Sequence, residues 1–147
     1  MERQVETLLR GSQFKQILDN YIKGLKDAYD LKRTEIEVLY YLSRCGERNT
    51  AKDITSSLHM NKGHISQTTE SLCQKGYISA AKDINDFRVV HYSITANAIR
   101  VAEEIDAAID RLYAALFAGI SAEDQESLKR IAAQMAANIS GMLTEDS

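Results

Sequence analysis

Hydrophobic residues recur at spacings of three and four along most of the chain, which is the spacing of one face of an α-helix. This pattern predicts six helices, over residues 2–28, 34–45, 51–58, 62–76, 95–118 and 121–145. Between the fourth and fifth helices the period changes, because residues 77–82 and 89–94 have β character and the polar segment 83–88 separates them. These two runs predict a β-hairpin with a protruding loop.

Polar residues mark the starts of five of the predicted helices. The expected capping residues are Thr34, Thr50, Asn61, Thr95 and Ser121. Thr34 and Thr50 are each followed three residues later by an acid, Glu37 and Asp53 respectively, which completes a capping box. The chain contains no proline, as expected where helix interiors must stay unbroken. The predicted fold class is therefore mainly α with a small β-hairpin.

The segment from Thr50 to Gly76 has the layout of a helix-turn-helix, because a short helix, a three-residue turn and a longer helix follow one another. The inner face of the longer helix is made of Ile65, Thr69, Leu72 and Gly76. Its outward side holds small and hydrogen-bonding residues: Gly63, His64, Ser66, Gln67, Glu70, Ser71 and Gln74. Such a face suits base edges and phosphates in the DNA major groove, and a solvated surface face has the same composition.

Three apolar stripes lie outside this compact middle segment, on residues 5–29, 98–117 and 128–143. One chain offers little of its own surface to cover them. Because an apolar stripe must be buried against something, a second copy of the chain is the simplest partner.

Charge differs more between segments than the total suggests. The 147 residues carry a net charge of −3. Residues 44–94 hold seven basic and five acidic residues, whereas residues 95–147 hold four basic and nine acidic ones. An acidic protein does not fit a non-specific binder of polyanions, and the mildly basic middle leaves room for a local nucleic-acid surface.

A helix-turn-helix followed directly by a two-stranded hairpin is the winged-helix arrangement, and here the sequence resembles the MarR family of bacterial transcription regulators. The matching positions are Thr34, residues 39–42, residues 61–67, residues 72–78, the hairpin pattern Asp83-x-x-Asp86-x-Arg88, and Ile94-Thr95. The resemblance covers essentially the full length, and the hairpin pattern in this order and spacing is its most specific element.

The resemblance implies a winged helix-turn-helix lobe at 34–94 flanked by dimerisation helices at 2–29 and 95–145, within one domain over 1–147. It implies a homodimer that binds a palindromic operator in double-stranded DNA and regulates transcription as a repressor, with release by a small-molecule effector left open. Arg88 would enter the minor groove from the wing, with Asp86 orienting it. The residues expected at the DNA are Lys62, Gly63, His64, Ser66, Gln67, Glu70, Ser71, Asn85, Asp86 and Arg88.

The chain departs from the family pattern at three positions. Gln67 and Asn85 stand where the family often has arginine, and Ala98 stands where it often has glycine. Two fewer cations predict weaker attraction to phosphates or a different operator, and leave the class of protein unchanged.

Other functions have less support. The His and Cys residues form no CxxC, HxxxH or HExxH arrangement, so neither a metal site nor a cofactor is expected. The sequence has no Gly-rich phosphate loop and no nucleophile elbow, so no enzyme is predicted. The rival interpretation is a helical dimer whose winged lobe binds a partner protein, which the acidic balance, Gln67 and Glu70 favour slightly.

Two cysteines and no long apolar segment fit a reduced, cytoplasmic protein without a membrane span. The hydroperoxide-sensing branch of the family uses a cysteine in the first helix, and this chain has none there. Packing is the expected role of Cys73, whereas Cys45 is the better candidate for a reactive thiol.

Overall fold

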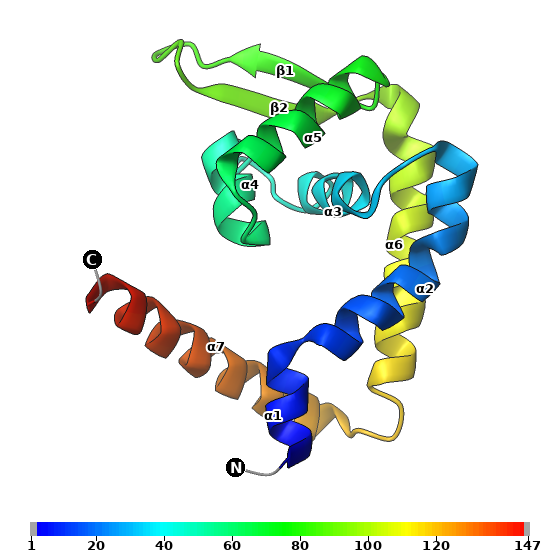
Figure 1. Cartoon of the computed structure of the whole chain (residues 1–147), viewed down its shortest axis with the longest axis vertical. Coiled ribbons are helices and arrows are strands. Elements are labelled where there is room, and N and C mark those ends of the chain that lie inside the picture. Colours follow the sequence, from blue (N-terminus) through cyan, green and yellow to red (C-terminus); the bar gives the residue numbers. More distant parts are fainter. Residues whose placement is uncertain (1–2, 146–147) are drawn as a thin grey trace. The chain divides into compact units, whose positions relative to one another are not determined.

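The computed structural model describes residues 3–145 and divides into two compact units, one up to Leu112 and one from Tyr113 onward. Its elements are α1 (Arg3–Arg10), α2 (Ser12–Tyr29), α3 (Arg33–Leu42), α4 (Ala51–Leu58), α5 (Lys62–Gln74), β1 (Ile78–Lys82), β2 (Val90–Ile94), the 3₁₀ helix η1 (Ala96–Ala98), α6 (Ile99–Leu116) and α7 (Ala122–Glu145) (Figure 1). The predicted mainly α-helical chain with one small hairpin is confirmed.

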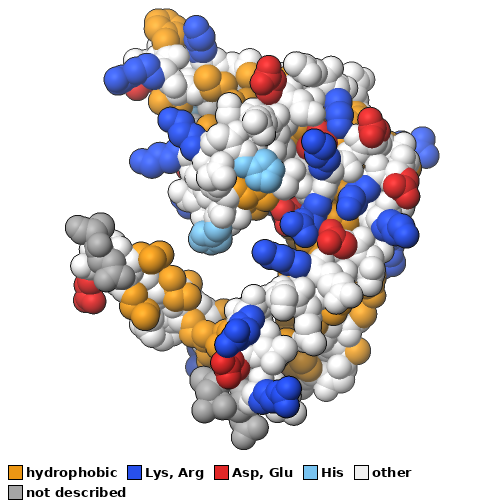
Figure 2. Space-filling view, viewed as in Figure 1, with side chains coloured by type: hydrophobic (Ala, Val, Ile, Leu, Met, Phe, Trp, Pro, Cys, Tyr) orange, Lys and Arg blue, Asp and Glu red, His pale blue; other side chains and the backbone are white. Residues whose placement is uncertain are grey.

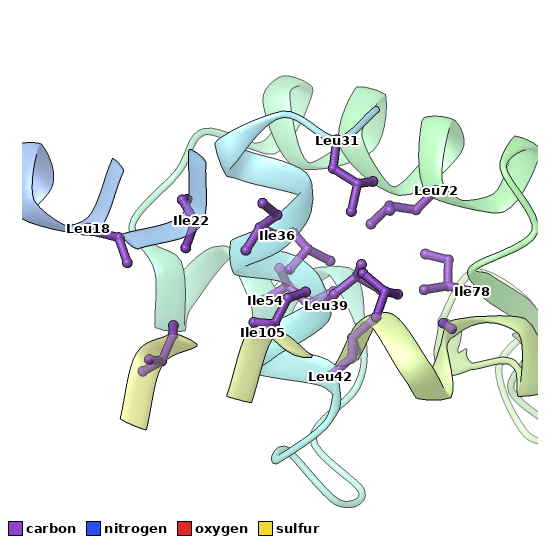
Figure 3. Close-up of a cluster of buried hydrophobic side chains, with 14 of the residues drawn as sticks. Leu18, Ile22, Leu31, Ile36, Leu39, Leu42, Ile54, Leu72, Ile78 and Ile105 are labelled. Atoms are coloured by element: carbon purple, nitrogen blue, oxygen red, sulfur yellow. The ribbon is translucent and has the colours of Figure 1, made fainter. Parts of the chain in front are cut away.

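The core of the first unit is built from apolar side chains that α2 to α6 each contribute from one face (Figure 3). Ile22, Ile54, Leu72 and Ile105 are fully buried there. Burying a side chain of this size stabilises the fold by about 1.5–3 kcal/mol. Of the inward residues predicted on the helix at 62–76, Ile65, Thr69 and Leu72 are buried and Gly76 is half-buried.

The helix-turn-helix formed by α4 and α5 has the predicted caps. The Thr50 hydroxyl accepts the Asp53 N–H at 3.2 Å, and the Asp53 carboxylate accepts the Thr50 N–H at 3.2 Å. The Asn61 side chain accepts the His64 N–H at 2.7 Å at the start of α5. His59 takes the left-handed conformation, with φ 53°, and this turns the chain from α4 towards α5.

The hairpin is antiparallel, and its register pairs Ile78 with Ile94 at the base. The second strand also contacts the segment before α4, because Tyr92 donates its N–H to the Asn49 carbonyl at 3.0 Å. At the base, the Thr95 hydroxyl donates to the Gly76 carbonyl at 2.6 Å. These bonds attach the hairpin to the segment just before α4 and to the segment just after α5.

Two helix starts differ from the prediction. The single helix predicted over 2–28 is wrong, because Gly11 at φ 73° separates α1 from α2, and residue 2 lies outside the described residues. The capping box at Thr34 and Glu37 is also wrong. The helix starts at Arg33, and Glu35 accepts the Lys32 N–H at 3.0 Å instead.

Two further boundaries are corrected. The second predicted helix ends at Leu42 and not at Cys45-Gly46. Thr95 does not cap the following helix through its side chain, since its hydroxyl is used by the hairpin, and η1 precedes α6. The Thr95 error arises because its hydroxyl bonds a residue 19 positions away, which no local pattern marks.

Helix α7, in the second unit, begins as predicted. Gly119 takes φ 80° before it, and the Ser121 hydroxyl accepts the Asp124 N–H at 3.1 Å. None of the described residues of α7 is buried. Its apolar residues are 36–67% exposed, namely Leu128, Ile131, Met135, Ile139, Met142 and Leu143. Within residues 3–145, no helix has the length and apolarity needed to cross a membrane.

Candidate nucleic-acid interface

Helix α5 has one buried face and one exposed face. Ile65 and Leu72 are at most 1% exposed and pack into the core. Six of the residues predicted to face DNA are exposed on the other side: Lys62, Gly63, His64, Ser66, Gln67 and Glu70. Their exposure fits the prediction, and contact with DNA remains a prediction.

Two threonines let α5 lie close to the core without unpaired hydroxyls. Thr68 and Thr69 are buried, and each donates its hydroxyl to a backbone carbonyl of the preceding turn, at 2.8 and 2.9 Å. Thr69 was predicted on the inner face, whereas Thr68 was not. The result is a helix whose orientation is fixed by its buried side, so that the exposed side is presented in a defined direction.

Gly63 lies in the first turn of α5, on the exposed face. A Cβ atom there would meet only the Asn61 side-chain oxygen, at the ordinary distance of 3.5 Å. Packing within the described chain therefore does not require glycine at this position. A bare backbone next to free helix N–H groups allows close approach of a phosphate.

Ser71 differs from the other predicted contact residues. It is half-buried, and its hydroxyl donates to Glu35 at 3.0 Å. Glu35 is 2% exposed and also accepts bonds from Lys75 Nζ at 3.0 Å and from the Lys32 N–H. The geometry therefore favours a role in anchoring α5 to α3 for Ser71 over a direct contact with DNA.

The turn of the hairpin holds Arg88 in a defined position. Asp86 accepts bonds from Arg88 Nε at 3.1 Å, from Nη2 at 3.3 Å and from the Arg88 backbone N–H at 3.0 Å. These bonds hold the pKa of Asp86 below its ordinary value. The Arg88 side chain is nevertheless 91% exposed. The expected orienting role of Asp86 therefore has a geometric basis, and the guanidinium remains available at the tip.

A second carboxylate in the hairpin, Asp83, belongs to the family pattern but had no role assigned to it from the sequence. Asp83 accepts the backbone N–H groups of Asn85 and Asp86 at 2.9 and 3.0 Å, and it contacts His91 Nε2 at 2.8 Å. The other ring nitrogen of His91 lies 2.6 Å from the Asn49 side-chain oxygen. The His91 hydrogen bond, followed by the two backbone bonds, lowers the pKa of Asp83. These contacts connect the loop to the segment before α4.

Both cysteines are half-buried, and burial raises the pKa of each thiol. A raised pKa reduces the fraction present as the reactive thiolate. This agrees with packing as the role of Cys73, and it weakens the case for Cys45 as a reactive thiol.

Comparisons with known proteins agree with this geometry. Residues 31–98 match a family described as a winged helix DNA-binding domain. The crystal structure of S. aureus MepR in a DNA-binding conformation is similar at a TM-score of 0.79 and 20% identity, over 95% of this chain and 99% of that one. An S. aureus MepR–DNA complex is similar at 0.71 and 20%, over 94% and 98%. A mutant E. coli MarR complexed with operator DNA is similar at 0.69 and 19%, over 90% and 94%.

Residues 31–98 therefore form a winged helix, built from α3, α4, α5 and the hairpin, which matches the model of a winged helix DNA-binding domain. With the flanking helices included, its fold is that of the MarR-type regulators, and the resemblance predicted from the sequence is confirmed.

Proposed function

We propose that this chain is a sequence-specific transcriptional regulator of the MarR family, which binds a palindromic operator in double-stranded DNA as a homodimer. The observation that carries the proposal is the pairing of two surfaces in one lobe. One is the exposed polar face of α5, and the other is the hairpin tip with Arg88 held by Asp86.

The two surfaces have different chemistry and should contribute differently. Gln67 is exposed one turn into α5, where its amide can bond the N6 and N7 atoms of an adenine in the major groove. Arg88 is an exposed cation at the tip of the hairpin, and Asp86 holds its guanidinium in place. The negative potential of a narrow minor groove attracts such a group. Gln67 therefore reads sequence, and Arg88 supplies general affinity.

Salt titrations of Gln67→Ala and Arg88→Ala on operator and scrambled duplexes test this division. Gln67→Ala should weaken operator binding by about 1–3 kcal/mol, with little change on scrambled DNA or in the salt dependence. Arg88→Ala should weaken binding to both duplexes and flatten the salt dependence, because fewer counterions are released. Equal losses and equal slope changes for the two variants would contradict the division.

The proposed dimer is supported by the exposed apolar residues on α1 and α7, including Leu8, Leu9, Ile131 and Ile139. Two lobes related by a two-fold axis match half-sites about one helical turn apart. A dimer covering its operator would block access to a promoter, so we propose that the protein is a repressor. Binding of a small-molecule effector would then release the dimer from DNA.

A mobility-shift assay on the promoter of its own gene tests DNA binding. Failure to shift any duplex would favour the alternative, a lobe that binds a partner protein.

A further inference from the structure

The tip of the hairpin carries two large apolar side chains in full contact with solvent. Within residues 3–145, Ile84 and Phe87 are the most exposed of the large hydrophobic residues, at 91% and 73%. Both values exceed those of the apolar residues on α7, which reach 67%. Figure 2 shows hydrophobic and Lys or Arg side chains next to one another at the end of the hairpin, at the upper left of the view.

Hydrogen bonds within the loop keep these side chains exposed. Asp83 accepts the N–H groups of Asn85 and Asp86, and the chain closes through Val89 N–H to the Asp86 carbonyl at 3.0 Å. The Asp83 N–H in turn donates to the Val89 carbonyl at 2.9 Å. These bonds fix the backbone of the loop, so Ile84 and Phe87 leave it at defined positions at the tip. The apolar tip is therefore preorganised for a partner.

We propose that Phe87, supported by Ile84, is an apolar wedge that enters the minor groove of the operator and partly unstacks one base step in each half-site. The inference rests on the proposed DNA-binding function and deepens it by assigning a further specificity-determining residue. The assignment of Phe87 rests on its position in the chain, because Phe87 lies directly between Asp86 and Arg88. A guanidinium in the minor groove brings the adjacent side chain to the base edges.

The chemistry of the groove explains why an aromatic wedge belongs there. Proteins that bind the minor groove combine Arg or Lys with an apolar side chain such as Phe, Ile or Leu, which kinks the duplex at the insertion site. The TA and CA/TG steps unstack most easily. We therefore expect such a step, flanked by A·T pairs, at the position that faces each wing. Two wedges would bend the duplex at two points.

The test uses the full-length dimer and a duplex recovered by the wild-type protein from a random-sequence library. 2-Aminopurine replaces each adenine in turn, and its fluorescence reports unstacking. We expect a rise at one position in each half-site, outside the α5 contacts. Phe87→Ala should abolish that rise in fluorescence. It should also abolish the bend of the duplex, which energy transfer between dyes at the two duplex ends measures. Its affinity for the duplex should be roughly tenfold lower. Its salt dependence should match wild type, because no charge is removed.

Matched variants separate the wedge from a general effect of exposed apolar surface. Ile99→Ala removes a large side chain that is 54% exposed outside the lobe. Once sedimentation shows that this variant is as dimeric as wild type, it should leave the fluorescence and the affinity unchanged. Phe87→Leu keeps an apolar side chain and should restore part of the signal. Phe87→Ala should melt at the wild-type temperature, because the loop is closed by bonds that Phe87 does not make.

The outcomes distinguish this inference from the proposed function. If wild type binds the selected duplex and no 2-aminopurine position brightens, or if Phe87→Ala retains the signal, the wedge is refuted and DNA binding stands. If wild type recovers no duplex from the library, the DNA-binding function fails and the wedge fails with it. In that case the apolar tip would be a surface for a protein partner.

Discussion

The winged-helix lobe and helix α7 show the same apolar periodicity in the sequence, and the structure treats them in opposite ways. In the lobe, Ile54, Ile65 and Leu72 are at most 1% exposed within one chain. On α7, none of the described residues is buried, and Ile131 and Ile139 are 54% and 53% exposed. Periodicity therefore shows which side chains need a partner surface, and it does not show whether the same chain supplies that surface.

The largest effect is expected on α7. Replacing Ile131 and Ile139 by glutamate places charges on the apolar stripe, so the dimer dissociation constant should rise by roughly a hundredfold or more. Sedimentation at a series of protein concentrations measures this change. The control is Ala137→Glu, which adds a single glutamate on the opposite side of α7 at 100° per residue. A double variant that remains as dimeric as the control would show that α7 is not the dimer surface.

The corresponding change in the lobe should not depend on protein concentration. Ile65→Ala removes a side chain that is 1% exposed, so the free energy of unfolding should fall by about 2–5 kcal/mol. Denaturant titrations of the variant at low and high protein concentration should give the same loss. Ile99→Ala, at an exposed position, should change stability by about 0.5 kcal/mol or less. A loss that varied with concentration would mean that the lobe is stabilised by the second copy.

The same contrast explains what the sequence could predict. Helix positions and the inward face of α5 follow from local periodicity, and Asn61 and Thr50 cap helices through bonds to residues three positions away. The Glu35–Ser71–Lys75 contacts join residues 36 and 40 positions apart, and His91 lies 42 positions from Asn49. No local pattern marks such pairs, because only the packed fold brings them together.

The candidate site divides in the same way. The exposed residues of α5 could be identified from helix geometry, whereas the wing residues Asp86 and Arg88 came from the family resemblance. Ser71 was assigned to the outward side, and its bond to Glu35 became evident only in the structure. The protruding loop predicted at 83–88 agrees with the exposure of Phe87, but the residue type alone favours burial, so Phe87 was not assigned to the site.

Acid should weaken the lobe through Asp83. Because hydrogen bonds lower the pKa of Asp83 in the folded protein, its ionised form stabilises the hairpin. This stability is fully present above the ordinary pKa, near 3.8, and is lost as the pH falls through the lower folded value. Protection factors of the hairpin amides, which correct for the fall of the intrinsic exchange rate with pH, should decrease in wild type from about pH 6 to about pH 3 and should change less in Asp83→Asn.

The control for this acid response lies on α7. Glu126→Gln removes an acid that pairs with Lys129 on an exposed surface, where such pairs contribute little. Its hairpin amides should respond to pH as in wild type. Identical pH responses in wild type and Asp83→Asn would show that the contacts of Asp83 do not govern the stability of the wing.

The smallest expected effect comes from a substitution of Gly63 by alanine. The added methyl group should change stability and DNA affinity in opposite directions. Gly63→Ala meets no closer atom than the Asn61 oxygen at 3.5 Å, so it should stabilise α5 by about 0.5–1 kcal/mol. If a phosphate approaches the bare backbone of this turn, the same methyl group must lower the affinity for DNA. Gly24→Ala in α2 is the matched control, because a Cβ there meets nothing within 4 Å and so causes no clash either. Melting curves should show both variants stabilised, and DNA titrations should show a loss for Gly63→Ala alone. Equal DNA affinities for the two variants would place the phosphate contact elsewhere on the lobe.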